Sequence, residues 1–361
     1  MSSQKKIRAL TALYRFYYRY RIRHLTEVSF RHGRIDRNWY ELFTYAADDK
    51  PSEHTYKVLK SFWADHIQLR KRAVRQLPKK AGDMEPVLLC VEKNSLIYLR
   101  KLLPYYRELG IHHFIFIDNA SDDGSAEYLD SQDDVTLYSA PYPFESHAKV
   151  GWMLQAIQEN GVDQWYLRVD SDEFLTWEGM EESGIAGMLE KMKARGSQSI
   201  RAVMVDMYPN RNLMQNSHDD AQFMEDYVYF DGGESYHMDP TCGRVFGGMR
   251  NRAVGAHLRM DKYILFDPAH KNIPVSNHDL TGIREETEFA CRCALRHYKF
   301  LVSEKEKYAF MVKEKKAGYS QFKEVKKYSK ILNGDVNAFS ECSVLYEAPA
   351  SLRSIDFLKP L

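Results

Sequence analysis

Short apolar runs that alternate with amphipathic helical segments are the feature of this sequence that most restricts its fold. From residue 86 onward, five segments have the composition of buried strands: VLLCV (87–91), HHFIFIDN (112–119), DVTLYSA (134–140), WYLRVD (165–170) and SIRAVMVDMY (199–208). They are separated by helical patterns over 95–109, from 126, over 149–160 and over 181–195. Strands that alternate with helices of this length form βαβ units, so the sequence predicts an α/β fold with a mostly parallel sheet flanked by helices.

Acidic residues stand where three of these strands end. Asp118, Asp170 and Asp206 each lie at the carboxyl end of a predicted strand. In open parallel sheets, ligands bind outside the carboxyl ends of the strands. We therefore expect these three carboxylates to share one site.

The motif Asp170-Ser171-Asp172 follows the fourth apolar run directly. Two carboxylates in one turn can reach a single hard cation, and Mn²⁺ or Mg²⁺ prefers oxygen ligands together with substrate phosphates. Such a cation would neutralise the charge on a departing diphosphate. A solvated turn is the alternative, but the buried strand before the motif and Glu173 after it favour a metal site.

The segment IDNASDDGS (117–125) places Asp118 and Asn119 at the tip of the second strand. Asp118 could accept hydrogen bonds from a ribose or a base, and Gly124 permits a turn whose backbone amides face a ligand. A purely structural Asx-rich turn has the same pattern, and the spacing leaves both interpretations open.

Four segments in order carry a family resemblance: VEKNSLIYLRKLLPYYRELGIHHFIFIDNASDDGSAEYL, WYLRVDSDEFL, RVFGGMRNR and LRHYKF. Together they resemble the family 2-like glycosyltransferases of bacterial surface-polysaccharide and lipopolysaccharide pathways, which have the Rossmann-like GT-A fold. The resemblance extends from about residue 86 to about residue 320. It implies metal-dependent transfer of a sugar from a nucleotide-diphosphate sugar to a glycan or lipid-linked glycan acceptor.

The resemblance also implies roles for individual residues in the nucleotide-sugar site. Asp118 would contact the nucleoside, and Asp170 with Asp172 would bind the metal and the diphosphate. Lys149 occupies a basic position that opens the helix before the DxD strand, where it could meet a phosphate. Family members often carry Arg-Asn-Glu after the first strand, whereas this chain has Lys93-Asn94-Ser95, so an acidic role in that loop would pass to Glu92.

His297, in LRHYKF, is by the same resemblance the third protein ligand of the metal, supplied by a segment beyond the sheet-forming region. A neutral imidazole suits Mn²⁺. His278 is the competing candidate, and a packed core histidine is the structural alternative.

The sequence leaves open which residues bind the diphosphate or an anionic acceptor and which residue acts as the general base. RVFGGMRNR (244–252) places Arg250 between two other arginines, where it could bind a diphosphate or an anionic acceptor. An inverting transfer needs a general base, for which we expect Asp206 or Asp231, with Glu234 less favoured. The rival functions are a metal-dependent nucleotidyltransferase, which would usually carry a glycine-rich phosphate loop after its first strand, and a catalytically silent membrane-associated scaffold.

The charge distribution divides the chain. Its formal net charge is +1, but residues 1–80 contain 19 Lys and Arg against 7 Asp and Glu. We expect a basic helical extension over 1–82, with helices over 5–24 and 53–76, a GT-A-type domain over 83–330, and a tail over 331–361 packed on that domain. The extension could pack on the catalytic body or contact an anionic membrane. No nucleic-acid-binding fold is recognisable.

The cellular compartment can be predicted from the membrane-spanning, signal and cysteine patterns of the sequence. No apolar run is long enough to span a bilayer, and residues 1–16 do not form a secretory signal. The five cysteines are few and odd in number, and Cys291 and Cys293 fall in a helical pattern whose spacing does not suit zinc. We expect reduced thiols and a cytoplasmic protein, peripheral at the inner face of the cytoplasmic membrane if the extension binds there.

Overall fold

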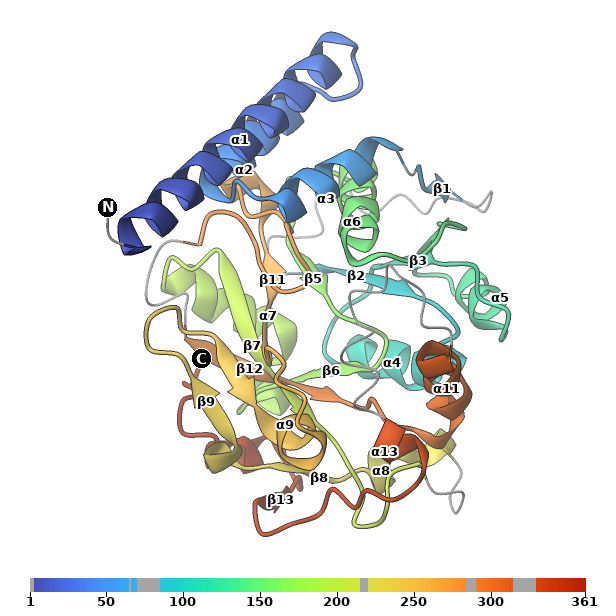
Figure 1. Cartoon of the computed structure of the whole chain (residues 1–361). Coiled ribbons are helices and arrows are strands. Elements are labelled where there is room, and N and C mark those ends of the chain that lie inside the picture. The colour runs from blue at the N-terminus through green and yellow to red at the C-terminus, as the bar shows by residue number, and fades with distance from the viewer. Residues whose placement is uncertain (1–2, 65, 70–84, 215–219, 284–289, 314–328) are drawn as a thin grey trace.

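A computed structural model describes residues 3–64, 66–69, 85–214, 220–283, 290–313 and 329–361. Its centre is a nine-stranded sheet flanked by helices (Figure 1), with the strand order β1-β4-β3-β2-β5-β11-β7-β12-β6. The bounds of these strands, in chain order, are β1 Gln68–Leu69, β2 Val87–Glu92, β3 Phe114–Asp118, β4 Val135–Ser139, β5 Tyr166–Arg168, β6 Glu173–Thr176, β7 Ser199–Asp206, β11 Asp261–Phe266 and β12 Cys291–His297.

Strand pairing confirms the predicted fold class. β4, β3, β2 and β5 are parallel neighbours, as are β7 and β12, while β11 runs antiparallel to both β5 and β7. β1 and β6 close the two edges in antiparallel pairings. Most strands of this Rossmann-like sheet therefore point the same way, which is consistent with a GT-A architecture.

Helices cover both faces of the sheet. Their bounds are α1 Ser3–Arg31, α2 Arg37–Asp49, α3 Glu53–Ala64, α4 Leu96–Glu108, α5 Ser125–Asp130, α6 Ser146–Asn160, α7 Met180–Ala194, α8 Phe223–Asp226, α9 Gly248–Val254, α11 Lys305–Lys313 and α13 Ser329–Leu332. Alternate residues of β2 enter two different cores: Leu88 and Cys90 pack with α4 and α7, whereas Val87 and Leu89 pack with α6 and the N-terminal helices. Because both faces are covered, β2 is continuously apolar rather than alternating.

Short strands and turns form a second layer next to the carboxyl ends of β7 and β12. They comprise β8 Tyr229–Asp231, β9 Tyr236–Met238, β10 Val245–Gly247, β13 Ser343–Leu345 and the 3₁₀ segments Asp220–Gln222, Gly233–Ser235, Val302–Glu304 and Pro349–Ser354. A further 3₁₀ segment, Pro268–His270, follows β11 at the opposite end, next to the start of β7. The C-terminal residues join this layer, because β13 pairs with β8 and Leu352 and Ile355 are buried in the main core.

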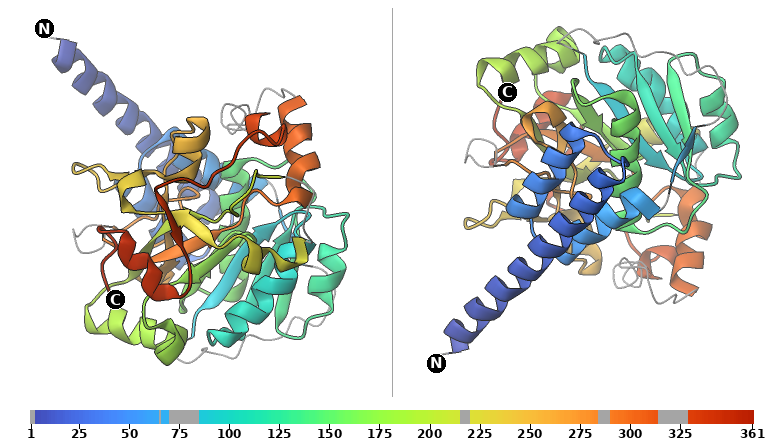
Figure 2. Two further views of the ribbon diagram at one scale, coloured as in Figure 1. Left: turned by 90° about the horizontal axis from the view of Figure 1, so that it is seen from below. Right: turned by 90° about the horizontal axis from the view of Figure 1, so that it is seen from above.

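The N-terminal helices differ from the sequence prediction in two respects. The helix expected over 53–76 ends at Ala64, and β1 then pairs with β4; residues 65 and 70–76 lie outside the described part. An additional helix, α2, buries Trp39 and Phe43 against Phe62 of α3. The N-terminal end of α1 projects away from the body (Figure 2). Among the described helices, none is both long and apolar enough to cross a membrane.

The segment around Cys291 was predicted to be helical, and this prediction was wrong. Cys291 and Cys293 lie in β12, between β7 and β6, with both thiols buried. Pairing with two neighbouring strands overrides the weak local helical pattern of this short segment. As a consequence, His297 ends a strand of the sheet instead of lying beyond it.

α3 and α6 approach closely at Gly151, which provides a test of how the extension is attached. An alanine Cβ at this position would lie 2.9 Å from Ser61 Cβ and 3.0 Å from the backbone nitrogen of Phe62. Because backbone atoms cannot move aside without separating the helices, we expect Gly151→Ala to lower the free energy of unfolding by about 1–3 kcal/mol in a urea titration. Glu159→Ala, at an exposed position of the same helix, should change it little. Equal midpoints for the two variants would contradict this packing.

Candidate active site

The carboxyl ends of the parallel strands bring most of the sequence-predicted residues to one edge of the sheet. Glu92 and Asp118 end β2 and β3 and are register partners. Asp206 and His297 end β7 and β12 and are also register partners. The DxD turn follows β5. The expectation that Asp118, Asp170 and Asp206 stand at strand ends is thus confirmed.

The DxD turn is fixed by its own backbone and by Glu173. The backbone N–H of Asp170 donates to Glu173 Oε2 at 2.8 Å, and the N–H of Glu173 donates to the Asp170 carbonyl at 3.0 Å. The Ser171 hydroxyl reaches the Ser95 hydroxyl at 2.9 Å. The turn therefore projects its two carboxylates from a rigid base at the end of the sheet.

Asp170 is held by two lysines. Lys149 Nζ, from the first turn of α6, lies 2.6 Å from Asp170 Oδ1, and Lys262 Nζ, from β11, lies 3.4 Å from the same oxygen. Burial alone would raise the pKa of Asp170, but the two lysines outweigh it and hold this pKa well below its ordinary value. Lys262 also donates to Glu173 at 2.7 Å.

Lys262 is a residue of this site that the sequence prediction missed. It is buried in DKYILF, a strand that begins with the buried Asp261 and continues after the lysine as an apolar run. A charged residue is rarely buried without a partner, so the position of this lysine inside an apolar run was the available signal. The strand was missed because β11 lies far along the chain from the βαβ repeat.

His297 joins the DxD motif to Asp206. Its Nδ1 lies 2.7 Å from Asp206 Oδ1, and its Nε2 lies 3.3 Å from Asp172 Oδ2. Arg250 donates through Nε to the other oxygen of Asp206 at 2.8 Å. Burial lowers the pKa of His297, but Asp172 and Asp206 outweigh this effect and raise it to about 9. Arg250 and His297 keep the pKa of Asp206 at about 2 against the effect of burial.

This arrangement suits a metal-ligating histidine in one respect. A histidine that binds a metal through one ring nitrogen usually donates the N–H of the other to a carboxylate, which fixes its tautomer and orientation. Asp206 Oδ1 is placed to accept such a hydrogen bond from Nδ1 of His297. Nε2 of His297 and Oδ2 of Asp172 would then be two neighbouring ligands of borderline and hard character, which Mn²⁺ accepts. Across the described residues, no group of three or more His, Cys, Asp or Glu side chains converges as a complete metal-ligand set. Further ligands would have to come from a bound substrate and water.

A second carboxylate pair occupies the ends of β2 and β3. Burial and the neighbouring Asp118 raise the pKa of Glu92 to about 9, so Glu92 is protonated at neutral pH. The backbone N–H of Ser121 donates to Asp118 Oδ1 at 3.1 Å. Asn119 has a different task, because its amide group donates to the carbonyls of Ala140 and Tyr142 at 2.6 and 2.8 Å and so holds the loop after β4.

Asp231 and His278 lie in other environments. Asp231 is fully buried; it accepts two hydrogen bonds from Arg252 at 2.7 and 3.0 Å and one from the Tyr208 hydroxyl at 2.5 Å. His278 Nδ1 contacts the Asp261 carbonyl at 2.7 Å, and burial lowers its pKa to about 4. The structure brings neither of them into the His297–Asp172 contact.

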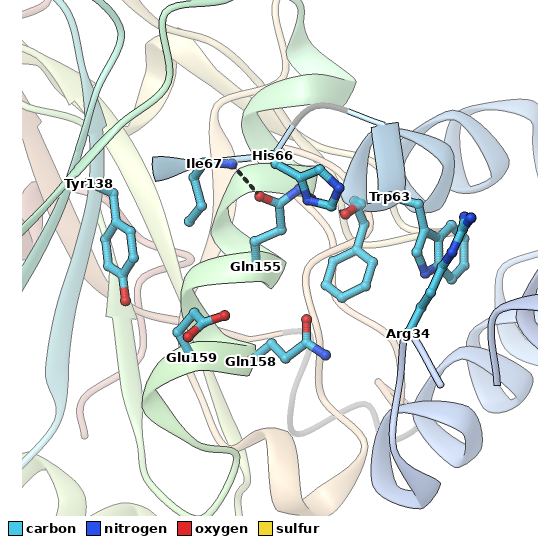
Figure 3. Close-up of a pocket in the computed structure, with 9 residues that line it drawn as sticks. Arg34, Trp63, His66, Ile67, Tyr138, Gln155, Gln158 and Glu159 are labelled. Atoms are coloured by element: carbon cyan, nitrogen blue, oxygen red, sulfur yellow. Dashed lines mark hydrogen bonds between the residues drawn. The ribbon is translucent and has the colours of Figure 1, made fainter. Parts of the chain in front are cut away.

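A cavity of about 540 Å³ lies away from these residues, between the N-terminal helices and the C-terminal half of α6 (Figure 3). Its lining consists of Arg34, Phe62, Trp63, His66, Ile67, Tyr138, Gln155, Gln158 and Glu159. The side chain of Gln155 forms part of the lining, and its Oε1 accepts a hydrogen bond from the backbone N–H of Ile67 at 2.7 Å. None of the predicted site residues lines this cavity.

Comparison with known proteins gives limited similarity. No family model matches the chain. A segment of 91 residues is 30% identical to a glycosyltransferase family 92 protein of Oryza sativa subsp. japonica; the match covers 24% of this chain and 15% of that protein. The matched segment thus spans only a small part of that relative's length.

Solved structures show still weaker likeness. S. aureus TarS 1–349 is 11% identical over 70% of each chain, with a TM-score of 0.30. HddC from Yersinia pseudotuberculosis is 9% identical over 50% of this chain and 73% of its own, with a TM-score of 0.27. A UDP-glucose pyrophosphorylase complexed with UDP-glucose is 8% identical over 76% of this chain and 98% of its own, also with a TM-score of 0.27. Scores this low carry no argument about activity.

The charge state of His297 can be measured directly. Its folded-state pKa of about 9 lies above the ordinary value of 6.5, so in the metal-free protein the imidazole carries a proton at neutral pH, which a bound metal ion would displace. The resulting stabilisation is complete below about pH 6.5 and is lost as pH rises through about 9. We expect NMR titration of the imidazole to show the raised pKa, and Asp206→Asn to lower it. The unfolding free energy of His297→Gln should lack this loss between pH 6.5 and 9. A wild-type midpoint near 6.5 would contradict the ion-pair geometry.

Proposed function

We propose that this protein is a glycosyltransferase that takes its sugar from a nucleotide-diphosphate donor and uses Mn²⁺ or Mg²⁺. The observation that carries the proposal is the contact of Asp172, in the DxD turn, with a histidine that Asp206 orients from the neighbouring strand. The weak similarity to a glycosyltransferase supports the same class.

Within this proposal, Asp172 and His297 hold the metal, together with oxygens of the diphosphate. When bound, the ion supplies electrostatic stabilisation of the charge on the leaving diphosphate. Lys149 and Lys262 lie beside Asp170 and add two positive charges at the same edge of the sheet. These lysines would balance phosphate charge, since a basic cluster at the carboxyl ends of strands suits an anionic ligand.

Asp118 and Glu92 would bind the nucleoside. Both side chains are buried, and the protonated Glu92 is hydrogen-bonded to Asp118, so the acceptor for a base or ribose would be the Asp118 carboxylate, with Glu92 holding it in place. Asn119 supports this site indirectly through the loop after β4.

The two residues expected as general base from the sequence, Asp206 and Asp231, are both engaged by cationic side chains. Both oxygens of Asp206 are engaged, one by His297 and one by Arg250, and both oxygens of Asp231 are engaged by Arg252. We therefore propose that Asp206 and Arg250 position His297, and that Asp231 holds β8 to α9.

The acceptor we propose is a glycan or lipid-linked glycan of a cell-surface polysaccharide, with the reaction in the cytoplasm.

The first test concerns Asp172. A panel of nucleotide sugars should be screened for Mn²⁺-dependent donor hydrolysis, and Asp172→Ala should reduce the rate by at least about 100-fold, because a lost ligand or its support typically costs 10–100-fold or more in metal affinity or activity. Asp163→Ala, at an exposed turn before β5, removes the same charge without touching the site and should keep wild-type activity.

Two results of this screen would contradict the proposal. Activity of Asp172→Ala equal to that of Asp163→Ala in metal-containing buffer would exclude Asp172 from catalysis. Release of nucleoside triphosphate from donor and pyrophosphate would identify a nucleotidyltransferase instead.

The second test concerns the nucleoside. Asp118→Asn keeps the side-chain shape but removes its charge, and a hydrogen bond to a charged group contributes about 1.5–3 kcal/mol. We expect calorimetry to show weaker binding of both nucleotide and nucleotide sugar, and kinetics to show a higher KM with a smaller change in kcat. Asp122→Asn, an exposed residue of the same loop, is the matched control. Unchanged nucleotide affinity would make 117–125 a structural turn.

A further inference from the structure

The N-terminal half of α1 exposes a large apolar surface. Leu10, Leu13, Phe16 and Tyr20 each leave between 64% and 66% of their surface open to solvent. Only from Ile22 onward does α1 bury side chains against α2 and α3. Figure 2 shows this half of the helix standing clear of the body in both views. An apolar surface of this size on a soluble chain marks a binding surface.

Most large apolar side chains of this helix lie opposite three of its arginines. At 3.6 residues per turn, Leu10, Leu13, Tyr14 and Tyr17 fall within an arc of about 100°, which Tyr20 and Phe16 widen to about 160° and which also contains Lys6 and Arg21. By the same geometry, Arg8, Arg15 and Arg19 fall within about 40° of one another, roughly opposite the apolar arc. All three arginines are exposed.

The charge of this segment is of one sign. Residues 1–26 contain seven Lys and Arg and no Asp or Glu. A second copy of α1 could cover the apolar arc, but it would bring two positively charged segments together. Arg19 and Arg23 are paired with Asp48 of α2, but this single carboxylate leaves the segment with an excess of positive charge. A nucleic acid could meet the arginines, but it would leave the apolar arc in water. The surface of an anionic bilayer offers headgroup charge and an apolar phase side by side.

We propose that α1 is a membrane-docking helix that lies in the interface of an anionic bilayer, with its apolar arc in the acyl boundary and its arginines among the headgroups. Arginine and tyrosine side chains are suited to this position, since each has an apolar body and a polar tip. The glycosyltransferase activity is not a premise of this proposal, because the evidence for it lies in α1 alone.

Vesicle co-sedimentation of the full chain tests the proposal without any catalytic measurement. Vesicles of phosphatidylglycerol and phosphatidylcholine in equal parts are compared with vesicles of pure phosphatidylcholine. The wild type should bind the anionic vesicles and bind the neutral ones much more weakly. Arg8→Gln/Arg15→Gln should weaken anionic binding about 25-fold, taking about fivefold for each arginine near the surface. Lys191→Gln/Arg195→Gln removes equal charge from exposed positions at the end of α7 and should have no effect.

The apolar contribution needs its own variant. Leu10→Gln/Leu13→Gln/Phe16→Gln keeps good helix formers and should reduce binding at least about 100-fold, because three large apolar side chains no longer enter the membrane. Leu345→Gln, at another exposed apolar position, is its control. Circular dichroism and sedimentation velocity on each variant establish its helix content and its oligomeric state.

Three outcomes would overturn the proposal. The first is a wild type that does not bind anionic vesicles. The second is binding that the α1 variants leave unchanged. The third is a wild-type dimer in the absence of lipid that the triple apolar variant converts to a monomer, which would make a second copy the occupant of this surface. Binding of anionic vesicles that needs both the arginines and the apolar residues supports it.

Discussion

Buried and half-buried carboxylates can share one edge of a sheet only if each has a compensating group from a neighbouring element, and this constraint organises the centre of the molecule. Lys149 and Lys262 stand beside Asp170, while Arg250 and His297 stand beside Asp206. Removing one member of such a group leaves an uncompensated buried charge, which is costly. The position of β11 between β5 and β7 follows the same requirement, since that strand carries Lys262.

In the other carboxylate pair, protonation of one member reduces the like-charge repulsion. Glu92 and Asp118 are register partners on adjacent parallel strands, and the pKa of Glu92 rises to about 9 through burial and the charge of Asp118. One half of the site is thus neutralised by side-chain cations and the other by protonation. An anionic ligand would meet positive charge beside the DxD turn and a carboxylate acceptor beside β2 and β3.

The sequence predicted the parts of the fold and site that depend on local pattern. The apolar runs at 87–91, 112–119 and 165–170 became central strands, and the acidic residues after them lie at the expected edge. Residues outside the βαβ repeat were harder to place, because their structure depends on distant partners. β12 owes its strand conformation to β7 and β6, and Lys262 owes its place to Asp170 and Glu173. The engagement of both Asp206 oxygens could not be predicted, because Arg250 meets that carboxylate through a helix 44 residues further on.

The residues of the site are drawn from a long stretch of chain, from Glu92 on β2 to His297 on β12. β7 and β12 are parallel neighbours although β8, β9, β10 and β11 intervene between them in sequence. Closing so long a loop costs conformational entropy before any contact across it forms. The site therefore comes into being only with the final assembly of the sheet, and no fragment that ends before β12 can contain it. A ligand that binds this edge would stabilise the whole cooperative unit rather than one subregion, since it binds only the fully assembled state.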